Sequence, residues 1–364
     1  MLTLFSAGSA LRATSRALPF GPSSRVATRF RGGAAEASAA TLDNPLLQQD
    51  SLPRFDTVAP ENVTPAIEEL LQRLDSEFTS LEGTLAAAEA NVAYADVVEA
   101  LERIEAPIEY AWGVVGHLMG VKNSDELRAA HGEMQPKVVQ TTTKLSQSAA
   151  VYAAVEHVLS SAGALDESQR RILQSSLQGM KLSGVALEGS AKEQFNANRM
   201  ELAELSTKFS NNVLDATKAW SMVVTDASQV DGLPPSAKAL LASRAAADGA
   251  DGATAEAGPW KLGLDMPAYL PAMKYIKDGA VREKLYRSFV TRAGAENEPL
   301  VRRILELKKE QAAILGYQTY AEVSIERKMA ESVTAAAQFS AQLWAQRCAQ
   351  FSGAILRRPR PAPP

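Results

Sequence analysis

Apolar residues recur along most of this chain with the spacing of one face of an α-helix. Between residues 64 and 81 they follow steps of three, one and four, which places them on a single stripe. The pattern returns after residues 94, 123 and 166, and the longest stretch, 190–220, contains neither proline nor glycine. About thirty residues make a helix of roughly 45 Å at 1.5 Å per residue. The sequence therefore predicts a mainly α protein.

Local signals indicate where these helices begin and where they are interrupted. Thr64 followed by Pro65 predicts an N-cap and a first helical residue, because a proline at that position gives up no helical hydrogen bond. Residues 123–126 predict a second helix start. Proline inside a helix removes a hydrogen bond and crowds the preceding turn, so we expect a break or kink at Pro107 and a kink at Pro136.

Two short segments predict a minor strand pair. Residues 221–225 are rich in β-branched side chains, and residues 259–264 alternate apolar with other residues. Between them, 245–258 consists largely of small and polar residues and is predicted to be a loop. Asp265 then predicts the cap of a helix that has Pro267 as its second residue.

Charge is distributed unevenly along the chain. The first 35 residues hold five arginines, no lysine and no acidic residue, and residues 332–364 hold four arginines and no acidic residue. Because the whole chain has a net charge of −4, residues 36–331 carry −13. An acidic body lacks the clustered basic face that nucleic acids require, so we interpret it as a solvated helical surface and expect no nucleic-acid partner.

The composition of residues 1–35 is typical of a mitochondrial or plastid transit peptide, with arginines, hydroxyl residues and interspersed apolar residues. A secretory signal would need a continuous apolar core, which Arg12 and Arg16 interrupt. Residues 36–43 are predicted to be a linker. The alternative is a merely disordered basic tail on a cytoplasmic protein. No apolar run approaches the roughly 18–20 residues of a membrane span, so no membrane association is expected.

The supply of metal-binding and nucleophilic side chains is small. The chain has one cysteine, Cys348, which rules out an internal disulfide and a cysteine-based zinc cluster. No two of the three histidines are four residues apart, so none begins the His-Glu-x-x-His motif of a zinc peptidase helix. We predict that His117 packs in a helix interface near Trp112. His131 and His157 are expected to be surface or cap residues.

Other signatures of catalysis and phosphate binding are missing from the sequence, including the G-x-S-x-G turn, the Walker loop and the dinucleotide-binding glycine motif. Residues 179–184 share only their glycine content with a phosphate loop, and a helix-ending turn explains them better. The carboxylate pairs Glu68/Glu69 and Glu102/Glu105 are interpreted as residues of solvated faces. We therefore predict no catalytic, cofactor-binding or metal-ligating residue.

Residues 258–275 read Gly-Pro-Trp-Lys-Leu-Gly-Leu-Asp-Met-Pro-Ala-Tyr-Leu-Pro-Ala-Met-Lys-Tyr. This segment resembles the tryptophan strand and Leu-Asp-x-Pro-x-Tyr-x-Pro-x-Met motif of the oligopeptidase A and thimet oligopeptidase family of zinc metallopeptidases. Further similar segments follow the order of the family, at residues 44–47, 52–55, 211–220, 281–293, 304–310, 315–324 and 328–330. The resemblance spans roughly residues 44–345 and points to the oligopeptidase A branch, including its organellar members.

The resemblance implies an almost wholly helical fold with two lobes that flank a deep channel. In the family, His-Glu-x-x-His and a downstream glutamate hold zinc in this channel, and zinc-activated water cleaves short peptides there. Those motifs lie beyond the matched region, so the resemblance carries over no zinc ligand. It implies a helical N-terminal lobe at 44–244 and the start of an incomplete catalytic lobe at 259–350. Short peptides are the expected partners, and a monomer is the expected state.

Residues 351–364 depart from the family and are predicted to be a disordered tail rich in proline and arginine. An aberrant early end and a genuine short isoform both fit this departure. Three hypotheses follow. The chain represents an organellar metallo-oligopeptidase that is inactive without its catalytic part, or it is a non-catalytic helical module that binds peptides or a relative. In the third, it is an unstable fragment that exposes apolar surface near Leu315, Phe339 and Trp344.

Overall fold

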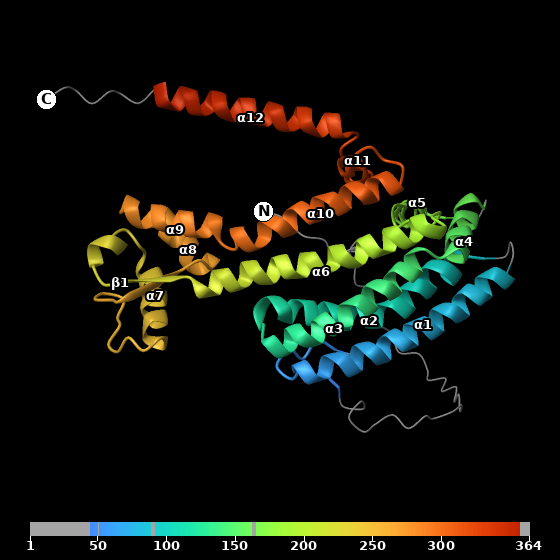
Figure 1. Ribbon diagram of the computed structural model, residues 1–364, viewed down its shortest axis with the longest axis horizontal. Coiled ribbons are helices and arrows are strands. Elements are labelled where there is room, and N and C mark those ends of the chain that lie inside the picture. Colours follow the sequence, from blue (N-terminus) through green and yellow to red (C-terminus); the bar gives the residue numbers. More distant parts are fainter. Residues whose placement is uncertain (1–43, 50, 89–91, 162–164, 357–364) are drawn as a thin grey trace. The chain divides into compact units, whose positions relative to one another are not determined.

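The computed structural model describes residues 44–49, 51–88, 92–161 and 165–356 (Figure 1). The predicted transit peptide and linker lie outside these residues. The chain divides into a first unit, residues 1–200 and 311–364, and a second unit, residues 201–310. In the described part, α-helices dominate and the strands form one two-stranded sheet, which confirms the predicted mainly α fold with a minor strand pair.

The first unit is a helical body in which α1 packs against α2, α3 and α4, and α4 packs against α5. Its core is made of the apolar stripes that the sequence predicts, and Phe78 of α1 lies fully buried within it. A single-turn 3₁₀ helix precedes α1, and a short π-helix precedes α2. The elements are η1 (Pro60–Asn62), α1 (Val63–Ala87), η2 (Ala95–Glu99), α2 (Ala100–Val121), α3 (Asp125–Ser146), α4 (Ala149–Ser160), α5 (Glu167–Leu182), α6 (Gly189–Ala219, continuing into the second unit), α11 (Tyr320–Ile325) and α12 (Val333–Leu356).

The predicted start of α1 is wrong by about half a turn. The helix begins at Val63 because η1, which has Pro60 as its own first residue, leads directly into it. Thr64 is therefore inside the helix and donates its hydroxyl hydrogen to Glu133 of α3, 3.1 Å away. The predicted start of α3 is confirmed, since Ser124 accepts a hydrogen bond from the backbone N–H of Leu127 at 3.2 Å.

Both prolines that were expected to disturb a helix are tolerated. Pro107 lies within α2 and Pro136 within α3, and neither ends its helix, so the alternative of a break at Pro107 is wrong. Buried neighbours such as Ile104 and Ile108 hold α2 against the core on both sides of Pro107. The free energy of that apolar packing offsets the lost hydrogen bond. The carbonyl of Pro107 also accepts a hydrogen bond from the Gln49 side chain at 2.8 Å.

The glycine-containing segment 179–184 is the helix-ending turn that the sequence predicts. Gly184 has a φ of 81° and follows the end of α5. Its N–H bonds the carbonyl of Lys181 at 3.0 Å, and the N–H of Val185 bonds the carbonyl of Met180 at 3.1 Å. This pair of bonds is the Schellman arrangement, in which glycine is favoured because it adopts a positive φ without strain.

The second unit is built around the strand pair. The two strands run antiparallel, with Ser221 opposite Gly263 and Val224 opposite Trp260. The alternation predicted for the second strand is confirmed, because Trp260 and Leu262 are buried and belong to one apolar core. The elements are the end of α6, β1 (Ser221–Val224), η3 (Ala227–Val230), α7 (Pro235–Ala247), β2 (Trp260–Gly263), α8 (Met266–Tyr275), α9 (Gly279–Thr291) and most of α10 (Gly294–Ile314).

Asp265 caps α8 as predicted, with Pro267 as the second helical residue. Its carboxylate accepts the backbone N–H of Ala268 at 3.3 Å. The same carboxylate binds both terminal nitrogens of Arg244 on α7, at 2.5 and 2.9 Å. The hydrogen bonds from Arg244, together with its positive charge, hold the pKa of the Asp265 carboxyl below its usual range. The cap therefore also links α7 to the start of α8.

The last described helix, α12, extends to Leu356 and so includes the first residues of the segment 351–364 that was predicted to be a tail. The remaining residues of the predicted tail, 357–364, lie outside the described part. The lobe boundaries at 244 and 259 stay predictions. Within the described residues, no helix has the length and apolar character needed to cross a membrane.

Candidate functional site

The three histidines occupy different surroundings, and two of them differ from the sequence prediction. His117, expected in a helix interface, is exposed, with its ring centroid 5.1 Å from that of Phe55. His157 lies in the last turn of α4, and its Nε2 is 3.2 Å from the Ser161 hydroxyl, which confirms a position at a helix end. In the described part of the chain, no group of three or more His, Cys, Asp or Glu residues could hold a metal ion.

His131, expected to be a surface or cap residue, is buried within α3. Its ring stacks on Trp112 with centroids 4.6 Å apart and planes 17° from parallel, so α2 and α3 meet through an aromatic pair. The Nδ1 atom is buried without a hydrogen-bond partner. Burial lowers the pKa of His131, because the charged imidazolium would lose its hydration. The sequence analysis expected His117, on the same helix as Trp112, to pack in a helix interface, whereas the histidine that packs on Trp112 is His131 of the next helix.

Glu105 on α2 is also misassigned by sequence reasoning. Its side chain is half-buried, and burial together with the negative charges of Glu109 and Glu102 raises its pKa to about 7. These carboxylates share one face of the helix at spacings of three and four residues. The prediction of a solvated-face residue is therefore wrong for Glu105. Glu68 fits that prediction better, since it forms a partly exposed ion pair with Lys137 at 2.5 Å.

A pocket of about 340 Å³ lies in the first unit, between the end of α5 and the segment around α11. Apolar side chains from α4 and α5 form part of its wall, and amide, ammonium, phenol and carboxylate groups form the rest. No motif in the sequence indicated this site, because its two halves are more than a hundred residues apart. The lining residues are Leu159, Gln174, Leu177, Gln178, Lys181, Leu182, Tyr317 and Glu326.

Direct contacts join the two sides of this pocket. The Gln178 side chain donates to the backbone carbonyl of Glu326 at 2.6 Å and to its carboxylate at 3.1 Å. Burial, the negative charge of Glu326 and a hydrogen bond with that residue raise the pKa of Tyr317. The pocket thus offers a phenol donor, a carboxylate and the Lys181 ammonium over an apolar wall. Such groups can bind the polar ends and amides of a small ligand, but they include no nucleophile paired with a base.

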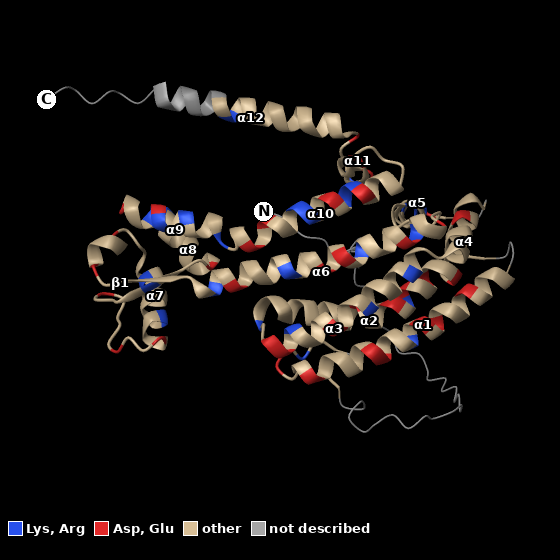
Figure 2. Cartoon of the chain, viewed as in Figure 1, with Lys and Arg blue, Asp and Glu red and all other residues tan. Residues whose placement is uncertain are grey.

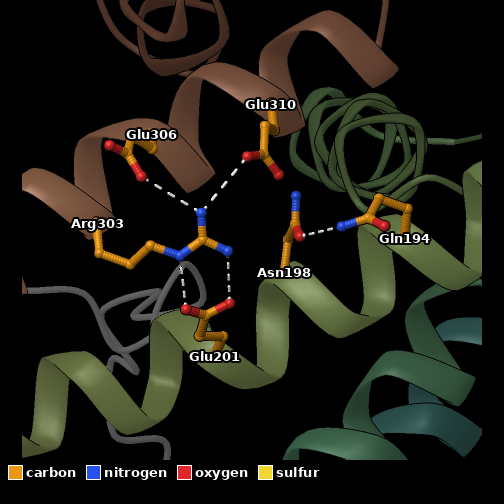
Figure 3. A network of polar contacts seen from close by, with 6 residues as sticks. All are labelled: Gln194, Asn198, Glu201, Arg303, Glu306 and Glu310. Carbon is orange, nitrogen blue, oxygen red and sulfur yellow. Dashed lines mark hydrogen bonds and ion pairs between the residues drawn. The ribbon is translucent and has the colours of Figure 1, made fainter.

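A second polar cluster joins α6 and α10 within the second unit (Figure 3). Arg303 forms two parallel contacts with Glu201, from Nε to Oε1 at 2.7 Å and from Nη2 to Oε2 at 2.9 Å. Its Nη1 lies 3.4 Å from Glu306 and 3.6 Å from Glu310. The hydrogen bond from Arg303 lowers the pKa of Glu201. The bidentate geometry orients α10 against α6, so we interpret the cluster as a structural ion pair rather than a reactive site.

Polar side chains also replace apolar ones along the buried part of α6. Asn198 is 1% exposed, and its Oδ1 accepts a hydrogen bond from Gln194, one turn earlier, at 2.8 Å (Figure 3). Asn196 accepts from Gln147 at 2.8 Å. Sequence reasoning followed only the apolar residues of this helix and missed the polar set, although the spacing of four between Gln194 and Asn198 was available as a signal.

Two family models match this chain. Residues 67–192 match the model described as "Neurolysin/Thimet oligopeptidase, N-terminal domain", and residues 272–356 match the model described as "Peptidase family M3". The first match covers most of α1 to α5, and the second runs from the end of α8 through α12. The matches follow one another in the order expected from the resemblance.

Several known proteins are similar over most of the chain. The Arabidopsis thaliana protein named "Probable cytosolic oligopeptidase A" is 42% identical over 300 residues, which is 81% of this chain and 42% of that relative. "Organellar oligopeptidase A, chloroplastic/mitochondrial" from the same plant is 41% identical over 292 residues, or 79% of this chain and 36% of the relative. Oligopeptidase A of Escherichia coli is 32% identical over 303 residues, or 80% and 43%.

The chain spans less than half the length of each of these relatives. Within that span, the first match lies in the first unit, whereas the second begins in the second unit and runs into residues 311–356 of the first. The identity extends into both matches. On these grounds the chain belongs to the oligopeptidase A and thimet oligopeptidase family.

Proposed function

We propose that this chain is part of a metallo-oligopeptidase that hydrolyses short peptides, and that it is inactive by itself. The observation that supports this most strongly is the ordered pair of matches at 67–192 and 272–356, combined with 42% identity to a relative named as an oligopeptidase A. In this proposal, 44–244 forms the N-terminal lobe and 259–350 begins the catalytic lobe.

The described residues do not fit a zinc ion. His131 is stacked on Trp112, His157 is bonded to Ser161, and His117 lies against Phe55. Among the residues that the structure describes, no carboxylate or thiol lies close enough to two of these imidazoles to form a group that could hold a metal ion. A structural or catalytic zinc site needs three or four convergent ligands. We therefore assign no step of peptide hydrolysis to a residue of this chain.

The test combines the chain alone with a chimaera. The full chain, supplied with zinc, is expected to leave a quenched short peptide uncleaved. A chimaera, in which residues 44–350 replace the aligned segment of the Arabidopsis cytosolic relative, is expected to cleave that peptide and to lose activity with a chelator. The unmodified relative is the matched control. A folded but inactive chimaera would count against the proposal, as would chelator-sensitive turnover by the chain alone that survives alanine replacement of all three histidines.

A second candidate function is peptide binding without cleavage, and the observation that favours it is the pocket at Lys181 and Glu326. Calorimetric titration of the chain with short unmodified peptides should give saturable binding. Lys181→Met is expected to weaken it, because the ammonium group is the positive partner available for a peptide carboxylate in that pocket wall. The exposed Lys122→Met variant is the matched control. No heat signal at millimolar peptide would rule this function out.

Delivery to mitochondria or plastids is proposed from the composition of residues 1–35, with support from the organellar relative. The cytosolic relative has nearly the same sequence identity to this chain as the organellar one, so the cytoplasm is the alternative location. Residues 1–43 fused to a fluorescent protein should carry it into an organelle. Replacing the five arginines of this segment by alanine should abolish import, and diffuse fluorescence from the unmodified fusion would contradict the proposal.

A further inference from the structure

The pocket at Lys181 and Glu326 contains two opposite charges that are not paired with each other. The ammonium of Lys181 comes from the last turn of α5, and the carboxylate of Glu326 belongs to the residue that follows α11. These two elements lie next to one another within the first unit (Figure 2). Neither side chain has an ion-pair partner among the residues that the structure describes. A pocket lined by a separate cation and anion suits a ligand that carries both charges.

Contacts with α5 and with Tyr317 orient the carboxylate of Glu326. Gln178 donates from Nε2 to the backbone carbonyl of Glu326 at 2.6 Å and to its carboxylate at 3.1 Å. Tyr317 forms a hydrogen bond with the same side chain. The next residue, Arg327, also lies against α5, where a Cβ atom at position 179 would be 3.6 Å from its Nη1. Because a carboxylate has about four acceptor sites, these contacts leave room for a ligand ammonium.

The ammonium of Lys181 is placed by an aromatic ring. Its Nζ lies 6.0 Å from the centroid of the Tyr152 ring on α4. A cation over an aromatic face is attracted to the π electrons, but this contact does not neutralise its charge. The ammonium therefore still provides donors for a charge-assisted hydrogen bond to a carboxylate.

The rest of the pocket limits the size and polarity of the ligand. Leu159, Leu177 and Leu182 supply an apolar lining, which suits apolar side chains. The volume of about 340 Å³ lies at the lower end of the roughly 300–1,000 Å³ that is usual for ligand pockets. An extended chain lengthens by roughly 3.3–3.6 Å per residue, so the two ends of a longer peptide would not meet both charges in so small a site.

We propose that this pocket binds a zwitterion of one or two amino-acid residues with apolar side chains. The carboxylate of the ligand pairs with Lys181, its ammonium pairs with Glu326, and its side chains lie against the three leucines. This inference rests on the second candidate function, peptide binding in the same pocket, and narrows the ligand to one whose two free ends are recognised together.

The test begins with calorimetric titration of the full chain with three forms of leucyl-leucine. The unmodified dipeptide has both charged ends, its N-acetyl derivative lacks the ammonium, and its C-terminal amide lacks the carboxylate. We expect saturable binding of the unmodified form. The dissociation constant should be at least about tenfold larger for either blocked form, because each loses one charge-assisted contact. A six-residue peptide with leucine at both ends and free termini should also bind at least about tenfold more weakly.

Two variants assign the ends of the ligand. Lys181→Met should weaken binding of the unmodified dipeptide about tenfold but leave binding of the amide unchanged, since the amide already lacks that contact. Glu326→Gln should weaken binding by a similar factor and leave the N-acetyl form unchanged. Lys122→Met and Glu331→Gln change exposed residues outside the pocket lining and should bind all three forms as the parent chain does. Circular dichroism would verify that each variant retains its helical content.

Three results would overturn the inference: no heat signal from the unmodified dipeptide at millimolar concentration, equal binding of the blocked and unmodified forms, or unchanged binding in Lys181→Met and Glu326→Gln. The comparison of blocked forms uses the parent chain, so it decides the matter even if a variant does not fold. If the six-residue peptide binds and the dipeptide does not, the inference fails while the second candidate function stands. Cleavage enters none of these measurements, so a failure of the peptidase proposal would remain distinguishable.

Discussion

The two matched regions differ in how completely they cover their own apolar residues. Region 67–192 encloses a single core, from Phe78 on α1 to Met134 on α3, and leaves one large apolar side chain exposed. Region 272–356 has buried residues such as Leu285 and Leu307, yet nine large apolar side chains are exposed among those that the structure describes there. The comparison teaches that the first region covers nearly all of its large apolar residues, while the second leaves many of them in contact with solvent.

The regions also place their charges differently. The first buries or half-buries two titratable groups, His131 and Glu105, whose charged forms are disfavoured. The second keeps its largest charge cluster, around Arg303, at a partly exposed position between two helices. Burial couples stability to pH, whereas exposed ion pairs respond to salt. His131 and Glu105 should therefore make the stability of the first region depend on pH, and the Arg303 cluster should make that of the second respond to ionic strength.

The largest expected contrast comes from removing one aromatic side chain from each region. Phe78→Ala should lower the free energy of unfolding by about 3–5 kcal/mol, because it leaves a cavity in a closed core. Trp344→Ala should change it by less than about 0.5 kcal/mol, because the indole is exposed in the chain alone. Urea unfolding followed by circular dichroism measures both. Similar losses in the two variants would remove the distinction between the regions.

The next effect concerns Glu105. Its pKa in the folded chain, about 7, lies above the value of about 4.3 for an unperturbed glutamate. The folded state therefore binds the proton more tightly, and this contribution to stability is full below about pH 4 and lost as the pH rises through 7. Glu105→Gln should be more stable than the parent chain by about 1–3 kcal/mol at pH 8, with little difference at pH 4.

Thermal melts at the two pH values measure this difference for Glu105→Gln, and Glu61→Gln on the exposed helix η1 is the matched control. If both variants respond to pH alike, the carboxylate of Glu105 is solvated and the burial argument fails.

His131 should give a smaller effect of opposite pH dependence. Burial lowers its pKa, so the unfolded chain takes up a proton near pH 6.5 while the folded chain resists it. Stability is therefore full above about pH 6.5 and falls as the solution becomes more acidic. The His131→Phe variant keeps a ring beside Trp112. Between pH 7 and 5.5 its free energy of unfolding should fall by about 1 kcal/mol less than that of the parent chain.

Denaturant unfolding at several pH values checks the prediction for His131. His117→Phe alters an exposed ring and should retain the acid sensitivity of the parent chain. An unchanged pH profile in His131→Phe would assign the acid sensitivity to other groups.

The smallest expected effect belongs to the second region. Arg303→Lys removes the bidentate contact with Glu201 but keeps the charge, so the melting temperature at low salt should fall slightly. In about 1 M salt the variant and the parent chain should melt together, because exposed charges are screened over short distances. Arg302→Lys, whose partner Glu298 is on the same helix, is the control. A loss that persists at high salt would mean that the pair is effectively buried.

Much of the fold was predictable because it depends on local rules. The helix stops and caps at Ser124, Gly184 and Asp265 are decided by nearest neighbours along the chain. The antiparallel strand pair was predictable from β-branched content and alternation. The prolines were less predictable, because their tolerance depends on packing from other helices. The pocket at Lys181 and Glu326 could not be predicted, since its two halves meet only in the folded chain.

By itself the sequence determined the helical periodicity, the uneven distribution of charge and the family to which the chain belongs. These properties are carried by residues close together in the chain or by the order of motifs along it. The tertiary structure decided which histidine is buried, that Glu105 is half-buried, and that Phe339, Leu343 and Trp344 of α12 are exposed. The reason is physical: desolvation and packing depend on what other segments contact a side chain, and periodicity along one helix does not specify those contacts.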